Sequence, residues 1–140
     1  MLARINMKKF FIAGLLTLTL IGSILAASSK SPMRKNSDGT YIVNTSTLCN
    51  AKGFNGATPV EVYIKKGKVV KIVALANNET PDFFAKVKNY LLPKYSNVKI
   101  GDAKKQTQAA KVDGCTGATY STKAVQQNIK AALDYYEKNK

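Results

Sequence analysis

Residues 113–122 read DGCTGATYST, a run of small and hydroxyl-bearing residues directly before a helical pattern. Its two glycines allow the backbone to approach a ligand closely. The first amides of a helix have no carbonyl partner within that helix, and the helix dipole adds partial positive charge at the same place. Such a junction binds phosphate well, although an ordinary capped turn before a helix has a similar composition.

Around this loop the chain is patterned as a small α+β domain. Apolar residues recur at three- and four-residue steps from Ser121 onward, which predicts an amphipathic helix. Strands are expected at 41–49, 60–65 and 69–75, with a glycine-bracketed turn at 50–56 and a tight hairpin at 66–67. We also expect a helix from Pro81 that ends at Pro93, and one short helix around 103–110. The fold class is therefore a small antiparallel sheet packed with helices.

The loop also resembles a known family. Asp113, two free positions, Thr116 and then Gly117-Ala118-Thr119 match the acceptor pattern of the FMN-binding domain family. That family includes the C subunit of the sodium-translocating NADH:quinone oxidoreductase and the G subunit of the Rnf electron-transport complex. The chain looks like a single-domain member, and the resemblance covers about residues 39–136.

The resemblance implies an electron carrier with FMN joined to the Thr119 hydroxyl by a phosphoester. A separate flavin transferase would attach the FMN from FAD with the help of a magnesium ion, so this chain would be its substrate and not an enzyme. Asp113 would be the recognition or positioning residue for the transferase, and Gly117 and Ala118 would keep the acceptor uncrowded. Further candidates for phosphate and polar contacts are Thr116, Ser121, Thr122 and Lys123.

A second candidate segment holds Glu79, Thr80 and Pro81. Thr80 is a good N-cap and Pro81 a good first helical residue, so these two are explained without a ligand. Similar Glu-Thr-Pro segments in the family lie against the flavin, and the resemblance implies that Glu79 contacts the isoalloxazine ring. The family often continues with glycine where this chain has Asp82-Phe83-Phe84, and Phe83 adds bulk there. Further candidates for cofactor contacts in the turn at 50–56 are Gly53 and Phe54.

Composition removes several other classes of function. Histidine is absent and only 8 acidic residues are present, which excludes Ser-His catalysis and suggests neither a paired-carboxylate site nor a metal cage. Without the three basic residues of the first 28, 19 basic residues stand against 8 acidic ones, a net charge of +11. No aromatic-interleaved basic block is present, so a solvated basic surface is favoured over nucleic-acid binding.

Residues 1–28 read as a signal peptide or an N-terminal membrane anchor. A basic start precedes an apolar run from Phe10 to Ala27, and the small residues 26–28 resemble a cleavage site. The run is about 18 residues long, at the lower limit for a membrane span. We expect a polar linker at 29–37, an FMN-binding domain at 38–140, and export to the periplasm or the outer face of the cytoplasmic membrane. Redox partners in the membrane or envelope are expected there.

The two cysteines permit one disulfide in an exported protein. We predict a bridge between Cys49 and Cys115, with two buried free thiols as the alternative. Two alternatives to the covalent carrier stay open: a non-covalent FMN-binding module or sensor of the same fold, and a cofactor-free secreted protein that binds polyanions.

Overall fold

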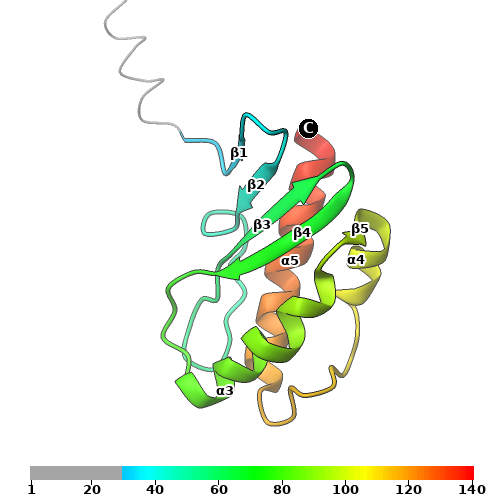
Figure 1. Ribbon diagram of the computed structural model, residues 1–140. Helices are drawn as coiled ribbons and strands as arrows, with labels where there is room; N and C mark the ends of the chain where they lie inside the picture. Colours follow the sequence, from blue (N-terminus) through cyan, green and yellow to red (C-terminus); the bar gives the residue numbers. More distant parts are fainter. Residues whose placement is uncertain (1–29) are drawn as a thin grey trace, which may run out of the picture. The chain divides into compact units, whose positions relative to one another are not determined.

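A computed structural model describes residues 30–140 (Figure 1). The predicted leader, residues 1–28, lies outside these residues. Residues Pro32–Lys140 form one compact unit. Within residues 30–140, no helix is both long enough and apolar enough to cross a membrane.

The sheet has five antiparallel strands in chain order. They are β1 (Met33–Lys35), β2 (Tyr41–Asn44), β3 (Val60–Lys65), β4 (Lys68–Ala74) and β5 (Val98–Lys99). The β3–β4 turn has positive φ at Lys66 (52°) and Gly67 (75°), as a two-residue type I′ hairpin requires. Alternate residues of β3 are fully buried, so the strand has one core face and one outer face.

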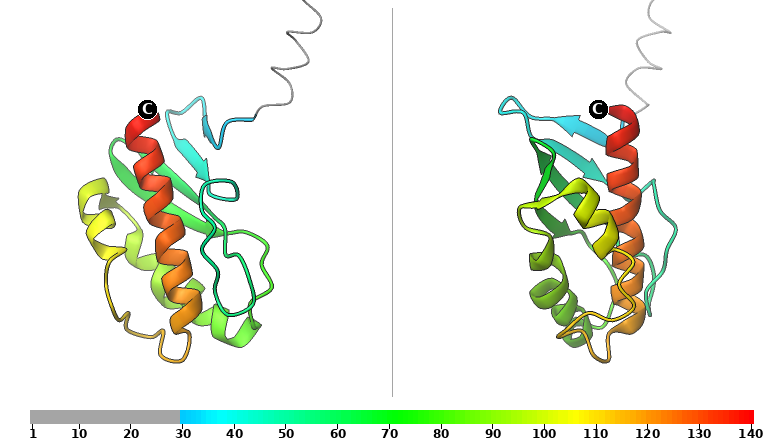
Figure 2. Two further views of the ribbon diagram at one scale, coloured as in Figure 1. Left: turned by 180° about the vertical axis from the view of Figure 1, so that it is seen from behind. Right: turned by 90° about the vertical axis from the view of Figure 1, so that its right-hand side faces the viewer.

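The helical segments cover one face of this sheet (Figure 2, right). They are α3 (Pro81–Lys86), a π-helical segment η1 (Val87–Leu91), a 3₁₀ segment η2 (Leu92–Tyr95), α4 (Ile100–Gln106) and α5 (Thr119–Asn139). The core lies between them and the sheet, where the α5 residues Val125, Ile129 and Leu133 are fully buried.

A buried polar network fastens α5 to the sheet. The Thr45 hydroxyl donates to Asn128 Oδ1 over 2.7 Å and accepts from the Val60 N–H over 2.9 Å. Asn128 Nδ2 in turn donates to the Ala124 carbonyl over 2.9 Å. Because buried polar groups are costly unless paired, this network specifies one position for α5. It thereby fixes the N-terminus of the helix, where the loop at 107–118 arrives (Figure 1).

The expected α+β architecture is confirmed, and several boundaries differ. The helix from Pro81 does not end at Pro93, because Pro93 sits in the first turn of η2, where its missing N–H costs nothing. The chain leaves the helical conformation only after Tyr95. β1 occupies part of the stretch expected to be a linker. The short helix is α4, which begins and ends a few residues earlier than expected, and the two-residue β5 was not predicted at all.

Candidate functional site

The loop before α5 is built from two successive tight turns. The Cys115 N–H donates to the Val112 carbonyl over 3.1 Å, and the Ala118 N–H donates to the Cys115 carbonyl over 3.0 Å. The third residue of each turn is a glycine with positive φ, Gly114 at 88° and Gly117 at 86°, which is the requirement of a type II turn. The two glycines therefore have a conformational role that only they perform without strain.

Three contacts hold this loop against α3 and η1. A Cβ atom on Gly114 would lie 2.7 Å from the Cβ of Tyr90, so the bare backbone packs on that ring. Lys86 Nζ donates to the Thr116 carbonyl over 2.6 Å. The buried Cys115 thiol donates to the Lys86 carbonyl over 3.6 Å. The loop is thus a fixed element of the domain.

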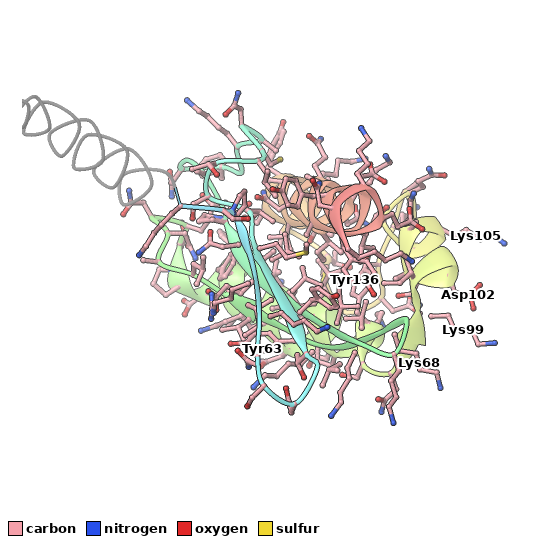
Figure 3. All side chains as sticks on the ribbon, turned by 90° about the horizontal axis from the view of Figure 1, so that it is seen from above. Tyr63, Lys68, Lys99, Asp102, Lys105 and Tyr136 are labelled. Atoms are coloured by element: carbon pink, nitrogen blue, oxygen red, sulfur yellow. The ribbon has the colours of Figure 1, made fainter. Side chains whose placement is uncertain are left out.

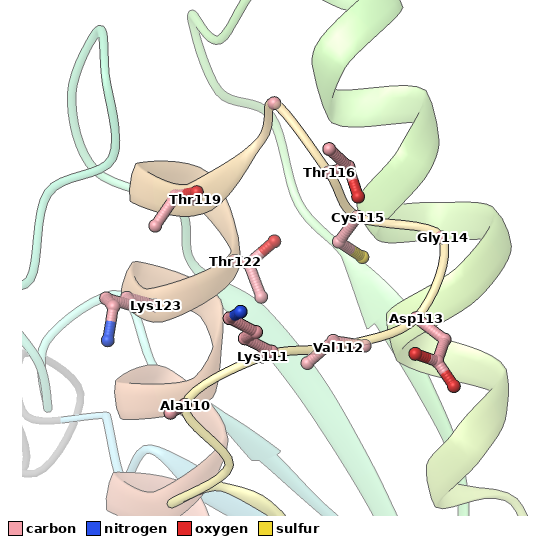
Figure 4. Close-up of a pocket in the computed structure, with 11 residues that line it drawn as sticks. Ala110, Lys111, Val112, Asp113, Gly114, Cys115, Thr116, Thr119, Thr122 and Lys123 are labelled. Carbon is pink, nitrogen blue, oxygen red and sulfur yellow. The ribbon is translucent and has the colours of Figure 1, made fainter.

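The loop and the first turn of α5 enclose a pocket of about 340 Å³ (Figure 4), within the usual size range of ligand sites. We call it the polar pocket. Lys111 and Lys123 contribute cations to its wall. The Thr122 hydroxyl also belongs to this wall and is buried without a hydrogen-bond partner. Since buried hydroxyls are nearly always paired, the orphaned hydroxyl marks a place where a ligand or water completes the site.

Thr119 is the first residue of α5 and lines the polar pocket. Its side chain is exposed, and its hydroxyl has no hydrogen-bond partner among the described residues. Asp113 lies at the far end of the loop, with its carboxylate pointing away from Thr119 (Figure 4). Thr119 is therefore accessible to a reacting partner, and Asp113 is accessible separately from it.

A second hollow of about 180 Å³ adjoins the end of the same loop, where Gly117 and Ala118 line it. We call it the aromatic cleft. Phe54 and Tyr120 are 71% and 67% exposed beside it, with ring centroids 6.3 Å apart. The other lining residues are Thr80, Phe83, Gly117, Ala118 and Ser121. Exposed rings around an apolar hollow are typical of a binding surface. Gly117 lines both hollows, so no side chain stands between them at that point.

Glu79 lies beneath this cleft and is buried, with 6% of its surface exposed. Its carboxylate accepts hydrogen bonds from the Phe54 N–H over 2.8 Å, from the Asn55 N–H over 2.5 Å, and from the Ser121 hydroxyl. Burial alone would raise the pKa of Glu79, but these three hydrogen bonds outweigh burial and lower it. Glu79 therefore ties the loop that carries Phe54 to the first turn of α5.

This arrangement gives several predicted site residues a structural role. Glu79 was predicted to contact the flavin ring, but its carboxylate accepts hydrogen bonds from three donors of the protein itself. The hydroxyl of Ser121, predicted to contact phosphate, is one of these donors. Gly53 is required because any Cβ there would collide with the Glu79 carboxylate. Thr80 is at the N-cap position of α3 without a side-chain cap, and Pro81 follows it as the first helical residue.

The sequence analysis missed four residues of the site. Phe83 and Tyr120 line the aromatic cleft, Lys111 lines the polar pocket, and Lys86 holds the loop. Phe83 was noted only as bulk where the family often has glycine. Tyr120 was readable as an outward residue, because it lies outside the apolar stripe of its helix.

The predicted disulfide is wrong in this structure, where both cysteines are free. Cys115 belongs to the segment 107–118, and Cys49 to the connection between β2 and β3. These two segments run on opposite sides of α5 in Figure 1 and in the left view of Figure 2. The helix therefore separates the two segments, whereas a bridge requires Cα atoms within about 7 Å.

A comparison with known protein families identifies the family to which this chain belongs. Residues 53–134 match the model of the FMN-binding domain, which is more than half of the chain. The chain belongs to the FMN-binding domain family. The match begins in the loop that carries Phe54 and ends within α5, so this FMN-binding domain includes both hollows. No curated protein and no solved structure gives a significant match.

The residues present fit FMN. A phosphate group needs cations and unpaired donors, and the polar pocket supplies Lys111, Lys123 and the orphaned Thr122 hydroxyl beside the first turn of α5. A flavin ring needs an apolar slot with flat side chains, and the aromatic cleft supplies Phe54 and Tyr120. The two sets adjoin along the loop, as the two ends of one ligand require.

Proposed function

We propose that this FMN-binding domain is an exported electron carrier whose FMN is joined by a phosphoester to Thr119. The observation that carries the proposal is the exposed, unpartnered hydroxyl of Thr119 at the first turn of α5, between a cationic pocket and an aromatic cleft. The match of residues 113–119 to the acceptor pattern supports the same residue.

Attachment requires a second protein, because the described residues contain no catalytic base beside Thr119. In the proposed reaction the Thr119 oxygen attacks the FMN-side phosphorus of FAD. A new O–P bond forms, the bond between the two phosphates breaks, AMP leaves, and the hydroxyl proton passes to a base of the flavin transferase, which also holds Mg²⁺. The two glycine turns present Thr119 to that enzyme, and the outward carboxylate of Asp113 gives it a recognition point.

Once attached, FMN supplies one- and two-electron redox chemistry. In our proposal Lys111 and Lys123 neutralise the phosphodiester, and Thr122 donates its free hydroxyl to the same group. The rings of Phe54, Phe83 and Tyr120 line the flavin ring. The side chains at the site hold and orient the cofactor, and none of them is a histidine, which favours a carrier over an enzyme with its own acid–base chemistry.

The proposed location is the periplasm or the outer face of the cytoplasmic membrane. Support comes from the basic start and the apolar run of residues 1–28. The partners proposed on either side of the carrier are redox proteins of the membrane or envelope. The basic surface of the domain would accelerate encounters with acidic partners at low salt.

Co-expression with a flavin transferase tests this function. The intact mass of the denatured protein should exceed that of the bare chain by one FMN attached with loss of water, and the denatured band should fluoresce. Thr119→Val should abolish the adduct while circular dichroism stays unchanged. Thr47→Val removes an exposed hydroxyl far along the chain and should keep it.

Other outcomes of this experiment select the alternatives. Yellow protein that releases its flavin when it is denatured would identify a non-covalent flavin module or sensor. Colourless protein that binds polyanions with a steep salt dependence would identify a cofactor-free binding protein. An adduct that survives Thr119→Val would place the attachment elsewhere.

A further inference from the structure

The sheet face turned away from the helices carries lysines and exposed valines. Figure 3 shows Tyr63 and Lys68 on the side of the sheet away from α5, whereas Tyr136 lies between α5 and the sheet. Four lysines belong to this face and to the hairpin at its end, and we call them the lysine face: Lys66, Lys68, Lys71 and Lys99. All four are exposed. Between them, Val70 and Val73 of β4 are 39% and 38% exposed.

Strand register places these charges directly against one another. Lys68 is the cross-strand partner of Lys65 in β3 and of Lys99 in β5, so three lysines form one row across three strands. Like charges directly opposite each other destabilise a sheet. Asp38 compensates the charge of Lys65, because Lys65 Nζ lies 3.8 Å from Asp38 Oδ2. Among residues 30–140, the members of the lysine face have no ion pair. Lys68 and Lys99 thus repel each other without compensation in the free domain, and an external anion would relieve that repulsion.

The neighbouring apolar groups indicate which kind of anion. A nucleic-acid surface would offer aromatic rings for base stacking, but the ring on this face, Tyr63, is covered by Lys71, whose Nζ lies 4.7 Å from the ring centroid. A second copy of the chain would set lysine against lysine. Lysines around exposed valines instead suit a bilayer surface, where cations meet anionic headgroups and apolar side chains enter the interface.

The chain before β1 favours the same partner. The apolar run of residues 10–27 is joined to the domain by only a few residues. At about 3.5 Å per extended residue, residues 28–32 reach on the order of 17 Å, so a leader retained in a membrane keeps the sheet close to the headgroups. We propose that the lysine face binds the surface of a bilayer that contains anionic phospholipid. The helices and the loop at 107–118 lie on the other face of the sheet (Figure 2), so this docking leaves the flavin site open to partners.

Lysine footprinting of the full chain tests the proposal independently of the flavin. The chain is synthesised cell-free with lipid nanodiscs, so that residues 1–29 stay attached, and is then acetylated briefly. One set of nanodiscs contains phosphatidylcholine alone, and the other contains added phosphatidylglycerol. At low salt, the lysine face should react several-fold more slowly in the phosphatidylglycerol nanodiscs than in the phosphatidylcholine nanodiscs. High salt should remove this difference. Lys52 and Lys88, exposed residues of the connection after β2 and of η1, should react equally in both.

A matched pair of variants makes the test specific. Each lysine near an anionic surface contributes a factor of roughly five to binding, so Lys68→Gln with Lys99→Gln should weaken binding by about 25-fold. The several-fold protection of Lys66 and Lys71 should then be lost. Lys52→Gln with Lys88→Gln removes the same charge and should leave that protection intact. Equal reactivity of the lysine face in both nanodiscs would overturn the proposal. Protection by single-stranded DNA but not by phosphatidylglycerol would overturn it in favour of a nucleic-acid surface.

Discussion

Replacing Glu79 with glutamine removes the charge that holds the loop carrying Phe54. The carboxylate accepts from two backbone N–H groups and from the Ser121 hydroxyl. Glutamine keeps one oxygen and turns its NH₂ group toward a donor, so at least one buried donor loses its acceptor. A buried unsatisfied donor costs about 1–3 kcal/mol, and a hydrogen bond to a charged group contributes about 1.5–3 kcal/mol. We therefore expect Glu79→Gln to lower the free energy of unfolding by about 2–4 kcal/mol.

The pH dependence gives this prediction a second, sharper readout. The pKa of Glu79 is lowered in the folded state from its ordinary value of 4.5. A carboxylate of this kind stabilises the fold fully above its unfolded pKa and loses that contribution as the pH falls through the folded pKa. The difference between wild type and Glu79→Gln should therefore be constant near neutral pH and should shrink below about pH 4.5.

Urea unfolding at a series of pH values measures both effects. Asp82→Asn is the matched control, because Asp82 is an exposed carboxylate in the first turn of α3 and its loss should cost only a few tenths of a kcal/mol. If Glu79→Gln unfolds within about 0.5 kcal/mol of wild type at neutral pH, Glu79 is not the tether we describe. A difference that grows toward acid pH would also refute the reasoning.

Three further predictions follow from the same geometry. Gly114→Ala should destabilise the domain by about 1–3 kcal/mol in urea unfolding, because its φ is positive and its Cβ would meet Tyr90; Gly101→Ala, with open space around it in α4, should be neutral or stabilising. Without reductant, iodoacetamide should label Cys49 faster than the buried Cys115 in the folded protein, and it should label both cysteines after denaturation. Failure to label either cysteine in the denatured protein would show that the predicted disulfide exists. Asn128→Ala should cost about 2–4 kcal/mol, because it breaks the buried network with the Thr45 hydroxyl; a smaller loss would mean that packing alone positions α5.

Much of the fold follows from local signals, and the exceptions have physical causes. The hairpin at Lys66-Gly67 and the alternation along β3 were predictable because turn chemistry and side-chain period act within a few residues. β5 was not predictable, since a strand of two residues has no period and exists only because β4 offers its edge. The predicted helix end at Pro93 was wrong because a proline ends a helix only where its missing N–H is needed.

The site likewise contains parts that were predictable from the sequence and parts that were not. The loop before α5 was readable because glycine, threonine and a helix start are adjacent in the sequence. The aromatic cleft was not readable as a unit, because Phe54, Phe83 and Tyr120 come from three distant segments. Glu79 lacked a structural reason in the sequence, since its three donors lie 24–42 residues away along the chain. Contacts of that length are set by the tertiary fold.

The most direct test of the account locates the flavin within one peptide. After co-expression with a flavin transferase, trypsin should release residues 112–123, which contain four aliphatic hydroxyls at Thr116, Thr119, Ser121 and Thr122. Fragmentation that preserves phosphoesters then assigns the added mass to a single residue. We predict FMN on Thr119 alone, the exposed threonine at the first position of α5. FMN on one of the other three hydroxyls, or a peptide without FMN from a yellow protein, would contradict the central claim.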